Sequence, residues 1–327
     1  MMGFDSIGLW GWAALGVGGV VLLCVQGAVW GWQQARRCGV DPALLQKAVR
    51  ESAAASVLPG LGSVLGVAVM AGYLGTPLAW LRFCLAGGLP YELTAATLTA
   101  GQGLARLTPT AYAGVALITT LGMLAGPLLC LTVLPWYVRV EKRQWAGWLT
   151  LAAATALAVL SALAMGRELI LSKPYYSVNL SNTTDAAALQ KSLCGVALLY
   201  WPGALVEFLV CAPLLGRAGS TVSFLAGNLS NLRLPCVLEA HARTGTRHGT
   251  PAGEGVGAVA VAASTAVTLG ITTAGSVCIA PFAESLGRLL RPFTGAVQVA
   301  VFVLYALPVV RCGVNFVKRY RAARHPA

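Results

Sequence analysis

The stretch SFLAGNLSNLRLPCVLEAHARTG, residues 223–245, lies between two long apolar segments and combines helix-interrupting residues with polar side chains. Gly227 and Pro235 mark the expected helix break, because proline lacks an N–H and glycine is conformationally permissive. The polar residues beside the break are Asn228, Ser230, Asn231 and Glu239. Backbone groups freed at a break cannot face lipid. We therefore interpret the stretch as a broken, partly re-entrant element that lines a solute path.

The composition of the chain is that of a membrane protein. Hydrophobic residues make up 57% of it, charged residues 10%, and the mean hydropathy is +0.72, whereas soluble domains carry about 25% charged residues. Several apolar runs are long enough to cross a hydrocarbon core about 30 Å thick. The sequence predicts seven transmembrane helices at about 8–32, 54–74, 110–136, 145–166, 192–215, 254–281 and 293–314. Asp41 and Pro42 predict the capped start of a short helix that runs into the second span.

The basic residues orient this arrangement. The net charge is +12, but the basic residues lie in short clusters beside apolar spans, a pattern that favours membrane orientation over nucleic-acid binding. If the loop after the first span is cytoplasmic, sixteen basic residues, Arg233 among them, lie on the inside. Seven, including Arg82, lie outside. This bias predicts a cell (inner) membrane protein with its N-terminus outside and its C-terminus in the cytoplasm.

A second stretch is similar to the opening one. FCLAGGLPYELTAATL, residues 83–98, and FLAGNLSNLRLPCVL, residues 224–238, share a Leu-Ala-Gly turn, a proline and a polar cluster. The first follows the second expected span and the second follows the fifth, which places them on opposite sides of the membrane. Similar elements at equivalent places of two three-span units indicate an inverted repeat. The seventh span is then an addition.

The first element offers the same chemistry as the second. Its expected helix breaks are Gly87, Gly88 and Pro90, and its expected solute or ion ligands are Tyr91, Glu92 and Thr94. Helix N-termini at such breaks attract anions, and freed carbonyl groups attract cations. The alternative interpretation is that both elements are surface loops or interfacial helices whose polar residues form turns and caps.

Other polar residues fall inside the expected spans. Glu207 lies in the middle of the fifth span, where a carboxylate costs about 2.5–3.5 kcal/mol on insertion scales. It is a candidate for binding a coupling proton or sodium ion, and the alternative is a structural hydrogen bond. Glu51, at the entry of the second span, is expected to be a cap or interface charge. The sixth span carries hydroxyl residues mostly on one face, which either line the path or join helices: Ser264, Thr265, Thr268, Thr272 and Thr273.

No motif for catalysis or for a cofactor is evident. The nine cysteines are scattered and form no CxxC pair, and the three histidines lie in segments expected to be cytoplasmic, which disfavours a zinc site. The sequence contains no GxSxG, Walker or HExxH pattern. We therefore expect no enzymatic activity, no metal site and no cofactor other than a coupling proton or sodium ion.

Three stretches resemble an uncharacterised bacterial membrane family catalogued as domain of unknown function 5058. They are SVLPGLGSVLG at residues 56–66, WLRFCLAGGLPYELTAATL at 80–98 and AGNLSNLRLPCVLEAHARTGTRHGTPAGE at 226–254. Together they cover about a fifth of the chain. The resemblance implies a multi-pass membrane protein and brings no established substrate.

The sequence as a whole predicts an all-α membrane protein of two inverted three-helix repeats, each with a broken or re-entrant element. The expected divisions are residues 1–143, residues 144–282, and residues 283–327 with an extra helix and a basic tail. The expected function is ion-coupled secondary transport of a small polar solute such as an amino acid or carboxylate. The alternative is a non-transporting membrane component of a larger complex. The expected partners are the lipid bilayer and the solute, without nucleic acid, and a homo-oligomer is compatible with this arrangement.

Overall fold

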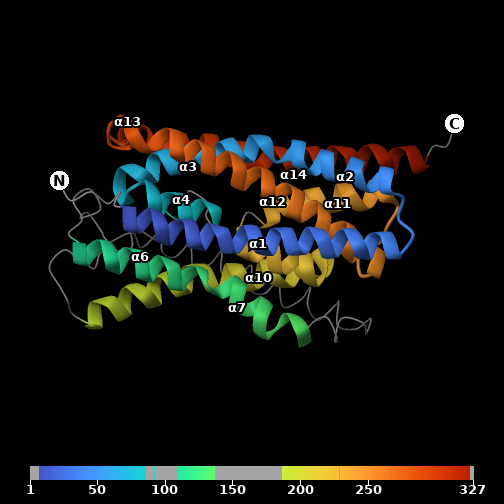
Figure 1. The fold of residues 1–327 in the computed structure, drawn as a ribbon, viewed down its shortest axis with the longest axis horizontal. Coiled ribbons are helices and arrows are strands. Elements are labelled where there is room, and N and C mark those ends of the chain that lie inside the picture. The colour runs from blue at the N-terminus through green and yellow to red at the C-terminus, as the bar shows by residue number, and fades with distance from the viewer. Residues whose placement is uncertain (1–6, 86–91, 93–108, 137–185, 228, 325–327) are drawn as a thin grey trace.

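The structure is a computed structural model that describes residues 7–85, 92, 109–136, 186–227 and 229–324. Within these ranges every regular element is a helix. The long helices lie roughly side by side along the longest axis of the molecule (Figure 1). The described part of the chain is therefore all-α, as the sequence predicts.

The first three helices follow the sequence pattern closely. Helix α1, Ile7–Arg37, is followed by α2, Pro42–Ala55, and α3, Val57–Leu74. The predicted cap of α2 is confirmed, because Asp41 Oδ1 accepts a hydrogen bond from the Ala43 N–H at 2.9 Å and Pro42 occupies the first turn. Helices α2 and α3 adjoin at Ser56, so together they form one long apolar element.

Five helical segments of the described chain are long and apolar enough to cross a membrane. They are Gly8–Arg37, Pro42–Leu74, Val115–Trp136, Leu193–Ala226 and Pro251–Phe282. These segments correspond to five of the seven predicted spans, and the third includes parts of α6, Pro109–Met123, and α7, Ala125–Thr132. The predicted span 145–166 lies outside the described residues. The predicted span 293–314 lies within α14, Thr294–Arg324.

Helix α12, Pro251–Ile279, occupies the centre of the molecule and is the most deeply buried of the five segments. It packs against α1, α2, α3, α4 and the helices of the second half. Glycines allow the closest approach to α1: a Cβ at Gly31 would lie 2.7 Å from the Gly255 carbonyl oxygen. The end of the molecule where α1 ends and α12 begins is called the proximal end below.

The opposite, distal end holds the end of α3 and the short helix α13, Ala283–Leu290. A Cβ at Gly72 would lie 2.6 Å from the Gly287 Cα, so these two backbones touch. Two 3-10 turns, Ala280–Phe282 and Arg291–Phe293, join α13 to α12 and α14. The chain thus turns over at the distal end before α14 returns along the molecule (Figure 1).

The chain reverses at Gly75 and folds back into the molecule. Gly75 has φ 75° and ψ 159°, a conformation that is essentially restricted to glycine. Helix α4, Thr76–Cys84, follows and packs against α3, α1 and α12. Trp80 Nε1 donates to Thr273 Oγ1 at 3.1 Å, near the distal end of α12. Helix α4, called the first arm below, therefore runs inward from the distal end.

A second reversal occurs within α10, Ala186–Ala226, at Gly216. Gly216 has φ 69° and ψ −177°, and a Cβ there would lie 2.9 Å from Glu254 Cγ at the start of α12. Residues 217–226, called the second arm below, then run inward from the proximal end. The expected element at residues 224–240 therefore starts earlier than the sequence indicates, at the turn that Gly216 makes.

The second arm ends at Gly227, which has φ 68°. A π-helical turn η2, Leu229–Arg233, and helix α11, Leu234–Thr244, follow. A Cβ at Gly257, near the start of α12, would lie 3.4 Å from Val237 Cγ1 and 3.8 Å from His241 Nε2, so α11 leads back toward the proximal end. Gly227, one of the predicted breaks, directly follows α10 with a positive φ, whereas Pro235 does not interrupt a helix. Pro235 lies in the first turn of α11, where its missing N–H is tolerated, so it starts this helix and does not interrupt it.

The inner ends of the two arms meet in one hydrophobic cluster. Cys84 of the first arm and Ala226 of the second arm share this cluster with Val20 of α1 and Leu269 of α12. Leu85 and Leu225, which the sequence aligned, pack against it. The described parts of the two stretches thus approach each other deep in the molecule. No contact can be assigned to Gly87, Gly88 and Pro90, which lie outside the described residues.

Candidate functional site

A buried arginine lies at the break that follows the second arm. Arg233 is 1% exposed and ends the π-helical turn η2, a type of element that is frequent at functional sites. Its Nη1 donates to Ser264 Oγ at 2.5 Å and its Nη2 donates to Thr268 Oγ1 at 3.0 Å. Both hydroxyls belong to α12, so α12 and η2 together hold the guanidinium.

The hydrogen bonds continue from Arg233 into α2 and α3. The hydroxyls of Ser264 and Ser56 lie 2.8 Å apart, and the Ser56 hydroxyl lies 2.7 Å from the Ser52 carbonyl oxygen. A hydroxyl has one hydrogen, so Ser264 donates to Ser56 when Ser56 donates to Ser52. The result is a buried chain of polar groups from the guanidinium to the backbone of α2, and successive bonds in such a chain strengthen one another.

This polar centre lies near the middle of the long helices. Ser264 is roughly 20 Å from both Pro251 and Ile279 along α12, at 1.5 Å per residue. Ser56 lies similarly far from both ends of the segment Pro42–Leu74. Arg233 is therefore at mid-depth, and counting it among the cytoplasmic loop charges was wrong. The guanidinium of Arg233 points toward α12, where its hydrogen-bond partners Ser264 and Thr268 lie.

The hydroxyl stripe of α12 makes two kinds of contact with other elements, and its predicted role in lining a solute path stays a prediction. Ser264 and Thr268 hold Arg233, whereas Thr273 accepts from Trp80 and joins α12 to the first arm. Thr265 is fully buried and donates to the Val261 carbonyl in its own helix at 2.8 Å. Along α12, the hydroxyls near the middle of the helix bind Arg233, and Thr273, nearer the distal end, joins α12 to the first arm.

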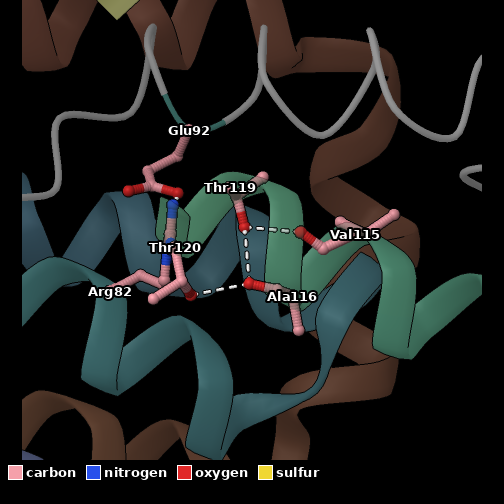
Figure 2. Close-up of polar contacts among 6 residues, drawn as sticks. All are labelled: Arg82, Glu92, Val115, Ala116, Thr119 and Thr120. Carbon is pink, nitrogen blue, oxygen red and sulfur yellow. Dashed lines mark hydrogen bonds and ion pairs between the residues drawn. The ribbon is translucent and has the colours of Figure 1, made fainter. Parts of the chain in front are cut away.

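The first arm carries a second buried arginine. Arg82 Nε lies 2.8 Å from Glu92 Oε2, with the two side chains 5% and 1% exposed. Arg82 Nη1 donates to Thr120 Oγ1 of α6 at 3.0 Å, and Figure 2 shows the guanidinium between the carboxylate and this threonine. Arg82 is thus not an exposed loop charge, as the basic-residue count assumed, but part of a buried ion pair that ties the first arm to α6.

The ion pair is incompletely satisfied within the described part of the chain. Arg82 Nη2 and Glu92 Oε1 are buried and have no hydrogen-bond partner there. Thr120 also donates to the Ala116 carbonyl at 2.6 Å, as Figure 2 shows, so its hydroxyl hydrogen is already used. The observed partner of Glu92 is Arg82, and the predicted role of Glu92 as a solute or ion ligand stays a prediction.

A cleft opens between α2, α11 and α14 at the proximal side of the polar centre. Its lining residues are Glu51, Ser52, Ala55, Pro235, Cys236, Glu239, Arg311, Cys312 and Asn315. Arg243 bridges Glu51 at 3.0 Å and Glu239 at 3.2 Å, so the expectation that Glu51 is an interface charge is confirmed. Glu239, a predicted pathway residue, lies in this cleft and not beside Arg233.

The inner part of the cleft adjoins the arginine centre. Ser52 and Cys236 lie in the cleft lining, and Cys236 Sγ is 3.8 Å from the Ser52 carbonyl oxygen. Cys236 follows Arg233 by about one helical turn, and Ser56 follows Ser52 by the same spacing. One layer of small side chains therefore separates the cleft from the polar centre.

Glu207 lies on α10, on a different helix from the residues around Arg233. It is half-buried on α10, and its neighbour Phe208 packs against Phe224 of the second arm at a ring-centroid distance of 5.7 Å. The structure thus places Glu207 on α10, next in sequence to a residue that packs against the second arm. Its predicted ion-coupling role stays a prediction.

Five predicted ligands cannot be placed in this site through their side chains. Tyr91, Thr94 and Asn228 lie outside the described residues. Ser230 and Asn231 belong to the backbone of η2, directly before Arg233. The polar side chain that the structure does place at this stretch is Arg233, which is not among the ligands predicted from the sequence.

A buried histidine lies at the proximal end of α11. His241 is 7% exposed, and its Nδ1 lies 2.9 Å from Thr246 Oγ1. Burial lowers the pKa of His241 to about 4, and the positive charge of His248 contributes in the same direction. His241 is therefore neutral at neutral pH and packs as part of the core.

Sequence comparison identifies the family. The sequence model of the family described as domain of unknown function DUF5058 matches residues 5–199. The chain belongs to this family. The matched part of the DUF5058 chain includes the first arm, Arg82 and Glu92, and it ends before the second arm. No curated protein and no solved structure matches the chain.

Proposed function

We propose that this DUF5058 protein is a secondary transporter that moves a small polar solute across the cell membrane, coupled to protons or sodium ions. The observation that supports it best is the meeting of two arms, which start at opposite ends of the helix bundle and share one cluster through Cys84 and Ala226. In a membrane, both arms are re-entrant. Helices broken at mid-depth are typical of transporter binding sites.

The two turns that begin the arms support an inverted repeat. Gly216 follows Gly75 by 141 residues, and Leu225 follows Leu85 by 140. Both glycines adopt nearly the same rare conformation, with φ 75° and 69°. The two arms run inward from opposite ends, which is the relation that an inverted repeat requires. The hydrophobic cores around the arms then form two units that can move against each other.

The orientation follows from the basic residues that remain at the surface. Arg36 and Arg37 end α1, and exposed Arg217 and Arg247 lie at the same proximal end. The positive-inside bias places this end in the cytoplasm. The cleft between α2, α11 and α14 is then the cytoplasmic approach to the polar centre, and the first arm enters from the outside.

The test is uptake by the full chain reconstituted into proteoliposomes. A panel of radiolabelled amino acids, carboxylates and nucleosides is offered under imposed pH and sodium gradients, with protein-free liposomes as the control. We expect uptake of at least one solute that rises with one gradient and is abolished when that gradient is collapsed. The absence of gradient-dependent uptake across the panel would contradict the proposal and favour a non-transporting component of a membrane complex.

A further inference from the structure

We infer that Arg233 binds the carboxylate group of the solute, so that the transported molecule is an organic anion or a zwitterion. This inference rests on the proposed transport function and names its substrate class. The observations that carry it are the burial of Arg233 at mid-depth, its hydroxyl partners and the cleft one layer away.

The chemistry of the centre fits a carboxylate. A guanidinium presents its N–H donors in a planar fork that matches the two oxygens of a carboxylate. Ser264 and Thr268 accept hydrogen bonds from this fork. Because a hydroxyl is both donor and acceptor, either residue can turn to donate to an incoming anion. The hydroxyls of Ser264 and Thr268 can therefore change from accepting hydrogen bonds from Arg233 to donating hydrogen bonds to the ligand by side-chain rotation alone.

The depth of Arg233 makes a functional role the default interpretation. An arginine at the centre of a membrane helix costs about 2.5–3.5 kcal/mol on insertion scales and usually marks a substrate or ion pathway. Arg82 is different, because its Nε lies 2.8 Å from Glu92 Oε2, a carboxylate of the same chain that balances its charge. Arg82 fixes the first arm to α6 through Thr120, whereas Arg233 lies one layer of side chains from the cleft, which makes Arg233 the better candidate for binding a solute anion.

The position of Arg233 also suits alternating access. It follows the break at Gly227, and its partners Ser264 and Thr268 lie on α12, which both arms contact. On the proximal side, Ser52 and Cys236 separate it from the cleft. A displacement of α11 from α2 by the width of one side chain would open the centre to the cleft. The ion pairs of Arg243 with Glu51 and Glu239 hold this contact closed.

Binding is tested on the purified full chain in detergent. The probes are the sodium salts of acetate, lactate, succinate, glutamate and alanine, with inorganic phosphate as a second anion class and sodium chloride of equal ionic strength as the reference. A ligand that binds only the folded state raises the unfolding temperature in a saturable way. We expect saturation with at least one carboxylate, and the phosphate measurement distinguishes the two classes of anion that a guanidinium can bind.

The variants assign that binding to the centre. Arg233→Gln should abolish the shift, and Arg233→Lys should weaken binding by roughly 10-fold or more, since hydrogen bonds to charged groups are the strong ones. Arg36→Gln, a change at an exposed arginine at the end of α1 that does not line the cleft, is the matched control and should keep the affinity within about 2-fold. If Arg233→Gln does not fold, Thr268→Val keeps the arginine and should weaken binding roughly 2- to 10-fold.

Three outcomes would overturn the inference: no saturable shift with any carboxylate, a shift only with phosphate, or a shift that persists in Arg233→Gln. Measuring carboxylate uptake distinguishes a failure of the Arg233 site from a failure of the proposed transport function. Carboxylate uptake that survives Arg233→Gln would keep the transporter and overturn the Arg233 site. Arg233-dependent binding without uptake in proteoliposomes would keep the site and overturn the transport function.

Discussion

The buried ion pair between Arg82 and Glu92 allows a quantitative test of the first arm. Removing one partner leaves the other charge buried, which costs about 3–5 kcal/mol. Both side chains are almost fully buried and their polar atoms lie 2.8 Å apart, so the full penalty applies. We expect Glu92→Leu and Arg82→Met each to lower the free energy of unfolding by about 3–5 kcal/mol.

The double variant distinguishes an ion pair from two independent contributions. Arg82→Met combined with Glu92→Leu removes both charges, and replacing a buried pair by apolar residues of similar size is often neutral or stabilising. Arg82 Nη2 and Glu92 Oε1 have no hydrogen-bond partner within the described chain, which limits what the native pair gains. We therefore expect the double variant to recover most of the loss of either single variant.

The assay is reversible unfolding of the detergent-solubilised protein by SDS, followed by tryptophan fluorescence. The matched control is the exposed pair of Arg243 and Glu51, whose side chains are 37% and 27% exposed at a distance of 3.0 Å. Replacing Arg243 by Gln, which removes this ion pair, should change the free energy of unfolding by less than about 1 kcal/mol. Additive losses in Arg82→Met/Glu92→Leu would refute the ion pair and the placement of Glu92 against the first arm.

Three further results are expected. The pKa of His241 is lowered from 6.5 to about 4 in the folded state, so the unfolded state binds more protons between these two pH values. The free energy of unfolding should therefore fall by about 3 kcal/mol as the pH falls from 6.5 to 4. Unfolding measured as a function of pH should show that His241→Gln removes this loss of stability. Gly216→Ala should cost about 1–3 kcal/mol in chemical unfolding, because φ is 69°, ψ is −177° and a Cβ there would lie 2.9 Å from Glu254 Cγ. A loss no larger than that of Gly270→Ala, at a glycine with nothing within 4 Å, would argue against a restricted turn at Gly216. Gly72→Ala, whose Cβ would meet a backbone atom at 2.6 Å, should lower the unfolding temperature, and Gly270→Ala, with nothing within 4 Å, should not.

The positions of most spans and of the second break could be predicted because their signals are local. Apolar length determines a span, and the Asp41 and Pro42 pair determines the start of α2. Gly227 was detectable because polar residues surround it inside an apolar region. The reversal at Gly216 could not be predicted, because residues 217–226 continue a helical pattern. The chain has 38 glycines, so a single glycine is weak evidence for a turn.

The two buried arginines could not be placed from local sequence. Arginines next to apolar spans usually lie at the surface, so Arg82 and Arg233 were counted as loop charges. Their burial depends on partners distant in sequence, Thr120 for Arg82 and Ser264 for Arg233. The hydroxyl spacing of the sixth span was the available signal, because a buried stripe of donors and acceptors requires a polar partner.

The measurement that tests the central claim most directly is side-specific cysteine labelling at the outer ends of the two arms. Arg217→Cys marks the start of the second arm, and Ser285→Cys marks α13, which lies at the end where the first arm starts. The background replaces the partly or fully exposed cysteines, Cys38, Cys194, Cys278 and Cys312, and keeps the buried ones. In intact cells, a membrane-impermeant maleimide should label Ser285→Cys at once and Arg217→Cys only after the membrane is permeabilised. Labelling of both positions from the same side would contradict arms that enter the membrane from opposite faces.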